Sequence, residues 1–155
     1  MLFRSYHMRA KILVFFLSIA AIFVVSYFSA PPEEEGLSYD THAYLGNAPL
    51  LLAIADTPEL RERGLSFTEG LKDGEGMFFV FGEMGYPGFW MKDMNYPIDM
   101  IWFDESRSIV DIRENVAPGT YPRVFQPLSP ARYVLEVPAF FAKKNGIKKG
   151  DRISF

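Results

Sequence analysis

Short runs of branched and aromatic residues alternate with glycine- and proline-rich turns from residue 41 to residue 155. Runs of this length, bounded by turn formers, are typical of β-strands. The continuous hydrophobicity of Met77–Phe81 and Ile98–Phe103 predicts that these two strands are neighbours in the centre of a sheet. Charged residues interrupt Ser108–Glu114, which we therefore expect near a sheet edge. The other predicted strands are Thr41–Leu45, Leu50–Ala55, Arg132–Val137 and Arg152–Phe155.

The stretch Phe89–Asp104 predicts a β-hairpin, with Phe89–Asp93 and Ile98–Phe103 as its strands and Met94–Pro97 as its loop. In this register Lys92 lies opposite Asp99, and directly opposed residues share one face of a sheet. Both predicted faces are largely apolar, so we expect both to be covered. One face would carry Trp90, Lys92, Asp99, Ile101 and Phe103, and the other Phe89, Met91, Asp93, Ile98, Met100 and Trp102.

Two short helices complete the predicted domain. Thr57 can cap a helix that has Pro58 at its first position and ends near Gly64. A second helix is expected over Pro138–Lys144, stopped by Asn145 and Gly146. The pattern as a whole predicts an α+β domain with a mainly antiparallel, strongly bent sheet or small β-barrel. Ala117–Pro130, with four prolines and no periodicity, is expected to be a functional loop or one packed against the domain.

The N-terminal region predicts a single transmembrane helix over Ile12–Ser29, because its 18 uncharged residues would span about 27 Å. Basic residues precede it and three glutamates follow it, which favours a cytoplasmic N-terminus and a globular domain outside the cytoplasmic membrane. A cleaved signal peptide, with a site at Val24-Val25-Ser26, is the alternative. The predicted organisation is a cytoplasmic flank (1–11), an anchor (12–29), a charged spacer (30–36) and one extracytoplasmic domain (37–155).

Composition excludes several kinds of chemistry. The chain has no cysteine and only two histidines, which excludes disulfides, thiol catalysis and Cys-based metal sites and argues against multi-histidine sites. A calcium site needs a dense acidic loop, and the sequence contains none. Residues 37–155 carry 13 basic and 16 acidic residues, so we expect no nucleic-acid partner. We also expect no cofactor and no metal.

The candidate ligand contacts are charged or aromatic residues on otherwise apolar strands. Lys92 and Asp99, beside the indole ring of Trp90, could hold a polar ligand. A salt bridge that fixes the register of the hairpin would explain the same two charged residues. Arg132 could reach an acidic ligand group, or it could form a weak surface ion pair with Glu136 on the polar side of the strand 132–137. The six candidates are Trp90, Lys92, Asp93, Asp99, Arg132 and Glu136. The three aspartates Asp93, Asp99 and Asp104 are also candidates for carboxylate catalysis. The predicted register argues against it, because Asp93 and Asp99 lie on opposite faces of the hairpin.

Five sequence stretches carry a family resemblance: FWMKDM, PIDMIWFD, GMFFVF, ARYVLEVP and GIKKGD. Over roughly Leu50 to Phe155 the chain resembles the domain of unknown function 192 family of bacteria and archaea. The resemblance implies a small, mainly β domain that is often exported, and it brings no established activity.

The function expected from these observations is a non-enzymatic ligand- or partner-binding module of the cell envelope. Its partner would be a small polar ligand, an envelope polymer or a membrane protein. The alternatives are a carboxylate-dependent hydrolase of envelope polymers and a structural accessory subunit of a membrane complex. A preformed pocket around Trp90 would favour binding or hydrolysis, whereas an exposed apolar patch would favour the accessory subunit.

Overall fold

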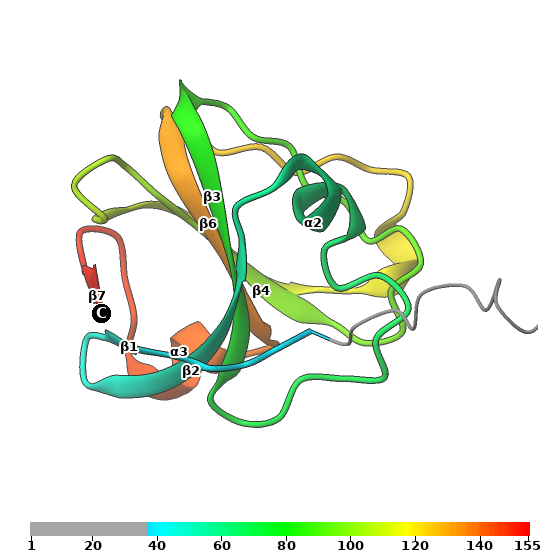
Figure 1. The fold of residues 1–155 in the computed structure, drawn as a ribbon, viewed down its shortest axis with the longest axis horizontal. Helices are drawn as coiled ribbons and strands as arrows, with labels where there is room; N and C mark the ends of the chain where they lie inside the picture. The colour runs from blue at the N-terminus through cyan, green and yellow to red at the C-terminus, as the bar shows by residue number, and fades with distance from the viewer. Residues whose placement is uncertain (1–36) are drawn as a thin grey trace, which may run out of the picture. The chain divides into compact units, whose positions relative to one another are not determined.

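Seven strands form one curved sheet in the computed structural model, which describes residues 37–155 (Figure 1). The predicted anchor at residues 12–29 lies outside the described residues. Within 37–155, none of the helices has the length and apolar character needed to cross a membrane. The elements are β1 (Thr41–Leu45), β2 (Ala48–Ala55), α2 (Pro58–Arg63), β3 (Glu75–Gly85), β4 (Ile98–Phe103), β5 (Ile109–Val116), η1 (Pro118–Thr120), β6 (Ala131–Pro138), α3 (Phe141–Asn145) and β7 (Ile153–Ser154).

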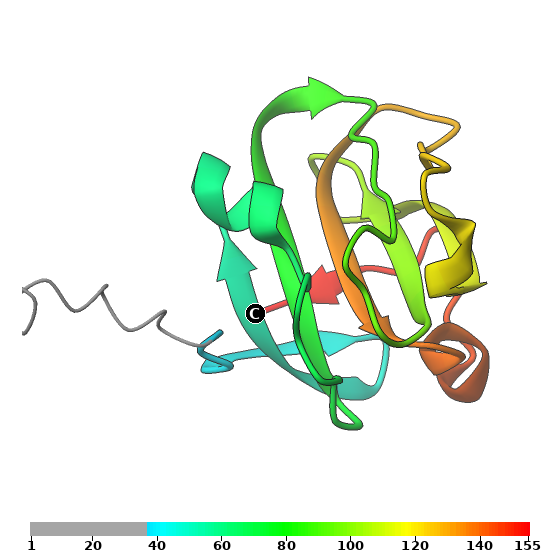
Figure 2. The same ribbon diagram turned by 90° about the vertical axis from the view of Figure 1, so that its right-hand side faces the viewer.

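The sheet order is β5-β4-β6-β3-β2-β1-β7, and every strand pair is antiparallel except β2 with β3. The ends of the sheet approach each other, because the amide of Ile109 donates to the carbonyl of Asp151 at 2.8 Å. Ser108 and Arg152 form an isolated bridge at the same place. The sheet therefore curls toward a barrel, as the two views show (Figures 1 and 2). A strongly bent, mainly antiparallel sheet with two short helices is thus confirmed, and β5 lies at a sheet end as predicted.

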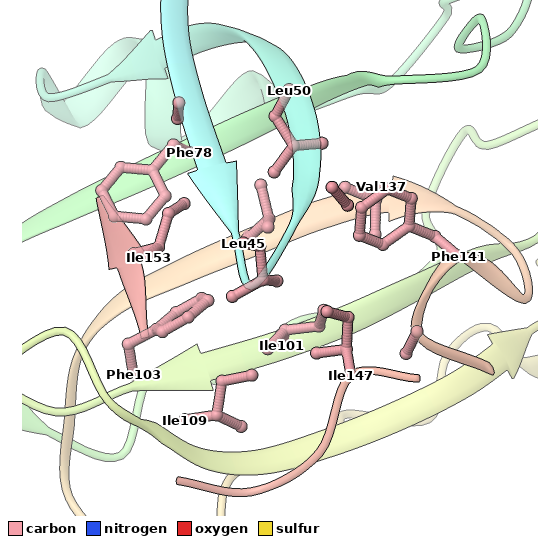
Figure 3. Packing of buried hydrophobic residues seen from close by; sticks show 14 of the residues in the cluster. Leu45, Leu50, Phe78, Ile101, Phe103, Ile109, Val137, Phe141, Ile147 and Ile153 are labelled. Atoms are coloured by element: carbon pink, nitrogen blue, oxygen red, sulfur yellow. The ribbon is translucent and has the colours of Figure 1, made fainter. Parts of the chain in front are cut away.

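The inner face of the curled sheet encloses the main core (Figure 3). On β4, Ile101 and Phe103 point into this core, while Met100 and Trp102 belong to a second cluster on the outer face. This alternation within β4 agrees with the predicted faces, and it is apolar on both sides because both sides are covered. The inner core also contains Leu45, Leu50, Phe78, Ile109, Val137, Phe141, Ile147 and Ile153.

The outer face of the sheet is covered by connecting segments. The second cluster joins Phe79 of β3 and Trp102 of β4 to Leu65, Met91 and Phe125, which belong to three different connections. Phe125 lies in the proline-rich stretch 117–130, so this loop is packed against the domain. Trp102 donates its indole N–H to the carbonyl of Pro87 at 3.1 Å, which ties the segment before residue 90 to the sheet.

Both helices have the expected end signals. The hydroxyl of Thr57 accepts a hydrogen bond from the amide of Leu60 at 3.2 Å, and Gly64 ends α2 with a positive φ of 53°. The second helix, α3, begins at Phe141, three residues later than predicted, and Gly146 ends it at a φ of 67°.

The predicted hairpin of Phe89–Asp93 with Ile98–Phe103 is wrong. Both edges of β4 are occupied, by β5 on one side and β6 on the other. Phe89 instead pairs with Phe125, and Asp93 takes a left-handed φ of 55° that breaks any extended strand. The expected adjacency of Met77–Phe81 and Ile98–Phe103 is also wrong, because β6 lies between β3 and β4.

Candidate functional site

Three acidic side chains are buried in the described part of the chain: Asp99, Asp111 and Glu136, which are 0%, 1% and 4% exposed. A buried carboxyl group is costly unless hydrogen bonds or opposite charges compensate it. A buried carboxyl group whose partners lie within the protein is explained by a structural role, whereas one without partners is a candidate for binding a ligand.

Asp99 on β4 has a complete set of backbone partners. Its Oδ1 accepts from the amides of Asn115 at 2.8 Å and Phe140 at 2.9 Å, and its Oδ2 accepts from Ala142 at 2.9 Å. The carboxylate thereby joins the end of β5 and the start of α3 to β4. No ion pair with Lys92 exists among residues 37–155, so the Lys92–Asp99 pair that the hairpin implied is also wrong.

Asp111 on β5 is equally well satisfied. Its oxygens accept from the amides of Ile112 at 3.0 Å and Leu128 at 3.1 Å, and they pair with Arg113 at 3.0 Å and Lys149 at 3.1 Å. Burial alone would raise the pKa of Asp111, but Lys149 and the two amides outweigh it, so the pKa is lowered. The bond to Leu128 fastens the proline-rich loop to the sheet.

Glu136 on β6 differs from both. In the strand register it lies opposite Met77 of β3 and Met100 of β4, both fully buried. No hydrogen bond or ion pair within 37–155 reaches its carboxyl group. Every side-chain nitrogen or oxygen in the same region that is inaccessible to solvent has a hydrogen-bond partner. Because the Glu136 oxygens have none, they must keep some solvent-accessible surface. Burial raises the pKa of Glu136 to about 8, which keeps the group protonated at neutral pH.

Two tyrosines face the same region. Burial first, and then Coulombic interaction with Tyr96, Glu75 and Glu136, raises the pKa of Tyr39 to about 12. Burial also raises the pKa of Tyr96, although its hydrogen bond with the Thr68 hydroxyl, 2.6 Å long, acts in the opposite direction. Both phenols stay neutral at neutral pH, so neither of them adds a charge near Glu136.

The space next to Glu136 is a pocket of about 250 Å³ on the outer face of the sheet. Its lining comes from the end of α2 and the residues after it, from β3, from residues 88–94 and from β6. Four of the lining residues are aromatic, and the charged ones other than Glu136 are exposed or half-buried. The residues that line the pocket are Arg61, Glu62, Arg63, Gly64, Leu65, Ser66, Phe79, Phe81, Gly88, Phe89, Trp90, Lys92, Met94 and Glu136.

Phe89 is the central ring of the wall. Its centroid lies 4.8 Å from Phe79, 6.4 Å from Phe81 and 6.2 Å from Trp102, each in an edge-to-face arrangement. The backbone of Phe89 exchanges two hydrogen bonds with Phe125, at 2.9 and 2.8 Å. The wall is therefore held in place by the proline-rich loop, which is itself fastened by Asp111.

The opposite side of the pocket is fixed by bonds between two connections. The hydroxyl of Ser66 donates to the carbonyl of Lys92 at 3.0 Å, and the amide of Phe67 donates to the carbonyl of Asp93 at 2.9 Å. These contacts hold residues 92–94 beside the end of α2. The pocket thus exists before any ligand binds.

The structure brings three of the six predicted contact residues together, because Trp90, Lys92 and Glu136 all line the pocket. Asp93 and Asp99 do not line it. Arg132 does not line it either; it pairs with Glu105 and donates to the carbonyl of Phe81 at 3.4 Å. A ligand-binding role for any of the six stays a prediction.

Sequence reasoning missed Arg61 and Arg63 and the wall residues Phe79, Phe81 and Phe89. The arginines give no signal in sequence, because a charged residue on a short helix is ordinarily solvated. Glu136 did give a sequence signal, because it is the single acid within the apolar run Val134–Val137. Residues of this run have apolar neighbours on both faces of the sheet.

The chemistry available in the pocket is limited to a few groups. A protonated Glu136 can donate one hydrogen bond and accept another, and it has the raised pKa expected of a general acid. Among residues 37–155, no group of three His, Asp or Glu side chains is arranged to hold a metal ion.

The chain was also compared with known proteins. No curated protein sequence matches it significantly. A crystal structure from Sinorhizobium meliloti 1021, provisionally described as a transcription regulator, is 30% identical with a TM-score of 0.70, and the match covers 77% of this chain and 96% of that one. A protein of unknown function from Novosphingobium aromaticivorans is 27% identical with a TM-score of 0.72, covering 81% and 91%. The model of the DUF192 family, described as Uncharacterized ACR, matches residues 42–155, and the chain therefore belongs to this family.

Proposed function

We propose that this domain is a non-enzymatic ligand-binding module and that the pocket over Glu136 is its binding site. The observation that carries the proposal is the carboxyl group of Glu136, which is 4% exposed, has no partner within 37–155 and opens into an aromatic pocket. A ligand that supplies the missing hydrogen bonds would remove the cost of burying this group. The preformed pocket beside Trp90 favours binding over a purely structural role.

The rival function is a hydrolase with Glu136 as general acid, which its raised pKa would suit. Carboxylate-dependent hydrolysis needs a second positioned carboxylate. Glu62, the other acid in the pocket lining, is exposed at its opening, and Asp99 is fully engaged with backbone amides. These observations favour binding.

The cell-envelope setting is part of the same proposal. It is supported by the apolar run Ile12–Ser29 with basic residues before it and acidic residues after it. The description of the Sinorhizobium protein as a transcription regulator suggests a nucleic-acid partner instead. The excess of acidic over basic residues in 37–155 argues against that partner here.

The test uses benzamide, whose flat ring suits the aromatic wall and whose amide can pair with a neutral carboxyl group. The chain has two tryptophans, so their indole N–H signals in a heteronuclear NMR spectrum serve as reporters. Trp90 lines the pocket and is 51% exposed, whereas Trp102 is buried and hydrogen-bonded. We expect a saturable shift of the Trp90 signal with a Kd on the order of 1 mM, and no shift of Trp102.

Three variants of the full-length chain make this test specific. Glu136→Gln keeps a donor and an acceptor and should bind benzamide about as well as the wild type, while Glu136→Leu should weaken binding at least about fivefold. Glu114→Leu, at an exposed position on β5, is the matched control. A Trp90 signal that does not respond, or equal binding by Glu136→Leu, would overturn the proposed function.

A further inference from the structure

The opening of the pocket is positively charged. Three cations and one acid line it, namely Arg61, Arg63, Lys92 and Glu62. Glu62 and Lys92 are exposed and the two arginines are half-buried, whereas Glu136 is buried. The pocket therefore has a cationic mouth and a polar but uncharged floor.

Arg61 is held rigidly at this mouth. Its Nη1 donates to the carbonyls of Asp56 at 2.6 Å and Val80 at 2.9 Å, and its guanidinium lies 5.5 Å from the centroid of the Phe81 ring. These contacts engage one guanidinium nitrogen, and the other donors of the fork make no hydrogen bond to any residue of 37–155. A fixed guanidinium is well suited to bind an anion because little side-chain entropy is lost.

Neither Arg61 nor Lys92 forms an ion pair within residues 37–155. Five other cations in this region do, because Lys72, Arg113, Arg132, Lys144 and Lys149 each lie against an acidic side chain. Arg61 and Lys92 therefore have charge available for a bound anion.

The mouth and the floor of the pocket differ in charge. Burial is the cause that raises the pKa of Glu136, and the mouth cations do not offset it. Tyr39 and Tyr96 also interact with Glu136, and neither of them brings a positive charge. A ligand that fills the pocket thus meets cations at one end and a neutral acid at the other.

We propose that the ligand is a small flat monoanion whose negative group is held at the mouth by Lys92 and Arg61 and whose other end carries a neutral hydrogen-bonding group for Glu136. This inference rests on the proposed function, since it assigns a ligand class to the same pocket. The aromatic walls formed by Phe79 and Phe89 account for the flat body between the two ends.

The experiment compares three probes of nearly equal size with the full-length chain, again through the Trp90 indole signal. They are 4-carbamoylbenzoate, terephthalamide and 4-(aminomethyl)benzamide, which share a benzamide body and carry a negative, neutral or positive group opposite the amide. We expect affinity to fall in that order, with the anion about three- to tenfold tighter than the neutral probe at low salt. Raising the salt concentration should reduce this preference.

Two variants locate the anion at the mouth. Lys92→Gln should weaken the binding of 4-carbamoylbenzoate about threefold and leave terephthalamide unchanged. Lys143→Gln, the same change at an exposed position on α3, should affect neither probe. A further probe, acetyl-Gly-Phe with a free carboxylate, tests whether the bound anion is the end of a peptide chain or a free small acid. Tighter binding than that of 4-carbamoylbenzoate assigns the pocket to peptide chain ends. Weaker binding assigns it to free small acids.

The outcomes distinguish the two proposals. If no probe shifts the Trp90 signal, the proposed function itself fails. If all three probes bind equally, or the cationic probe binds most tightly, the pocket binds ligands but the inference about charge is wrong. An equal loss of affinity for the benzoate and terephthalamide in Lys92→Gln would also overturn it.

Discussion

Glu136 carries a carboxyl group in surroundings that are otherwise almost entirely apolar. Its strand neighbours across the sheet are Met77 and Met100, and burial shifts its pKa from 4.5 to about 8. Between these two values the folded protein holds a proton that the unfolded chain has lost. Stability therefore falls as pH rises through this window.

We predict that the free energy of unfolding decreases from pH 5 to pH 8 by up to about 1.4 kcal/mol per pH unit. Asp104 and Asp111 have pKa values lowered from 3.8, so their contribution is lost only in more acidic solution, below this window. Glu136→Gln should remove the slope and be more stable than the wild type at pH 8. Urea unfolding at four pH values measures this, with Glu114→Gln as the control. A slope that persists in Glu136→Gln would show that another group causes it.

At the scale of elements, the three connections on the outer face build the pocket. The residues after α2 and residues 92–94 are bonded to each other, and the proline-rich loop fixes Phe89. Asp99 has the corresponding role on the other side of β4, where it holds α3 and the end of β5. Lys92 and Asp99 thus belong to different parts of the molecule.

We predict that Asp99→Ala lowers the free energy of unfolding by about 3 to 5 kcal/mol, because three amides lose a charged acceptor. Lys92→Ala, at an exposed position, should change it by less than about 0.5 kcal/mol. The double variant should equal the sum of the two, since the side chains share no partner. Denaturant unfolding of the four proteins gives the coupling energy. A coupling above about 1 kcal/mol would restore the Lys92–Asp99 pair that the structure lacks.

At the scale of the whole molecule, the proposed binding module would stand outside the cytoplasmic membrane. Residues 30–36, APPEEEG, would then be a short charged spacer between the anchor and the domain. A pocket on the outer face of the sheet would be open to small molecules of the cell envelope.

We predict that protease added to intact spheroplasts removes the globular domain and leaves a short membrane-bound stub. The anchor Ile12–Ser29 would protect the stub, and the basic N-terminal flank would stay in the cytoplasm. Immunoblots against both ends of the chain measure this, with a cytoplasmic protein as the control for intact cells. Complete protection, or a soluble mature form that begins near Tyr27, would count against the anchor.

Several strands and both helices could be predicted from the sequence because their signals are local. The cap at Thr57 and the alternation within β4 depend on neighbouring residues only. The pairing of Phe89–Asp93 with β4 failed because strand pairing is a long-range choice. The edges of β4 are taken by β5 and β6, and the partner of Phe89, Phe125, lies far along the chain.

By itself the sequence determined a mainly antiparallel, bent sheet with two short helices, and it gave six candidate contact residues, of which Trp90, Lys92 and Glu136 line one pocket. Only the tertiary structure decided what these three residues have in common. Burial and hydrogen-bond satisfaction depend on which segments cover a side chain, and periodicity cannot specify those segments. Asp99 and Glu136 are both acids on apolar strands, yet three amides from β5 and α3 satisfy one, while the other faces an open pocket.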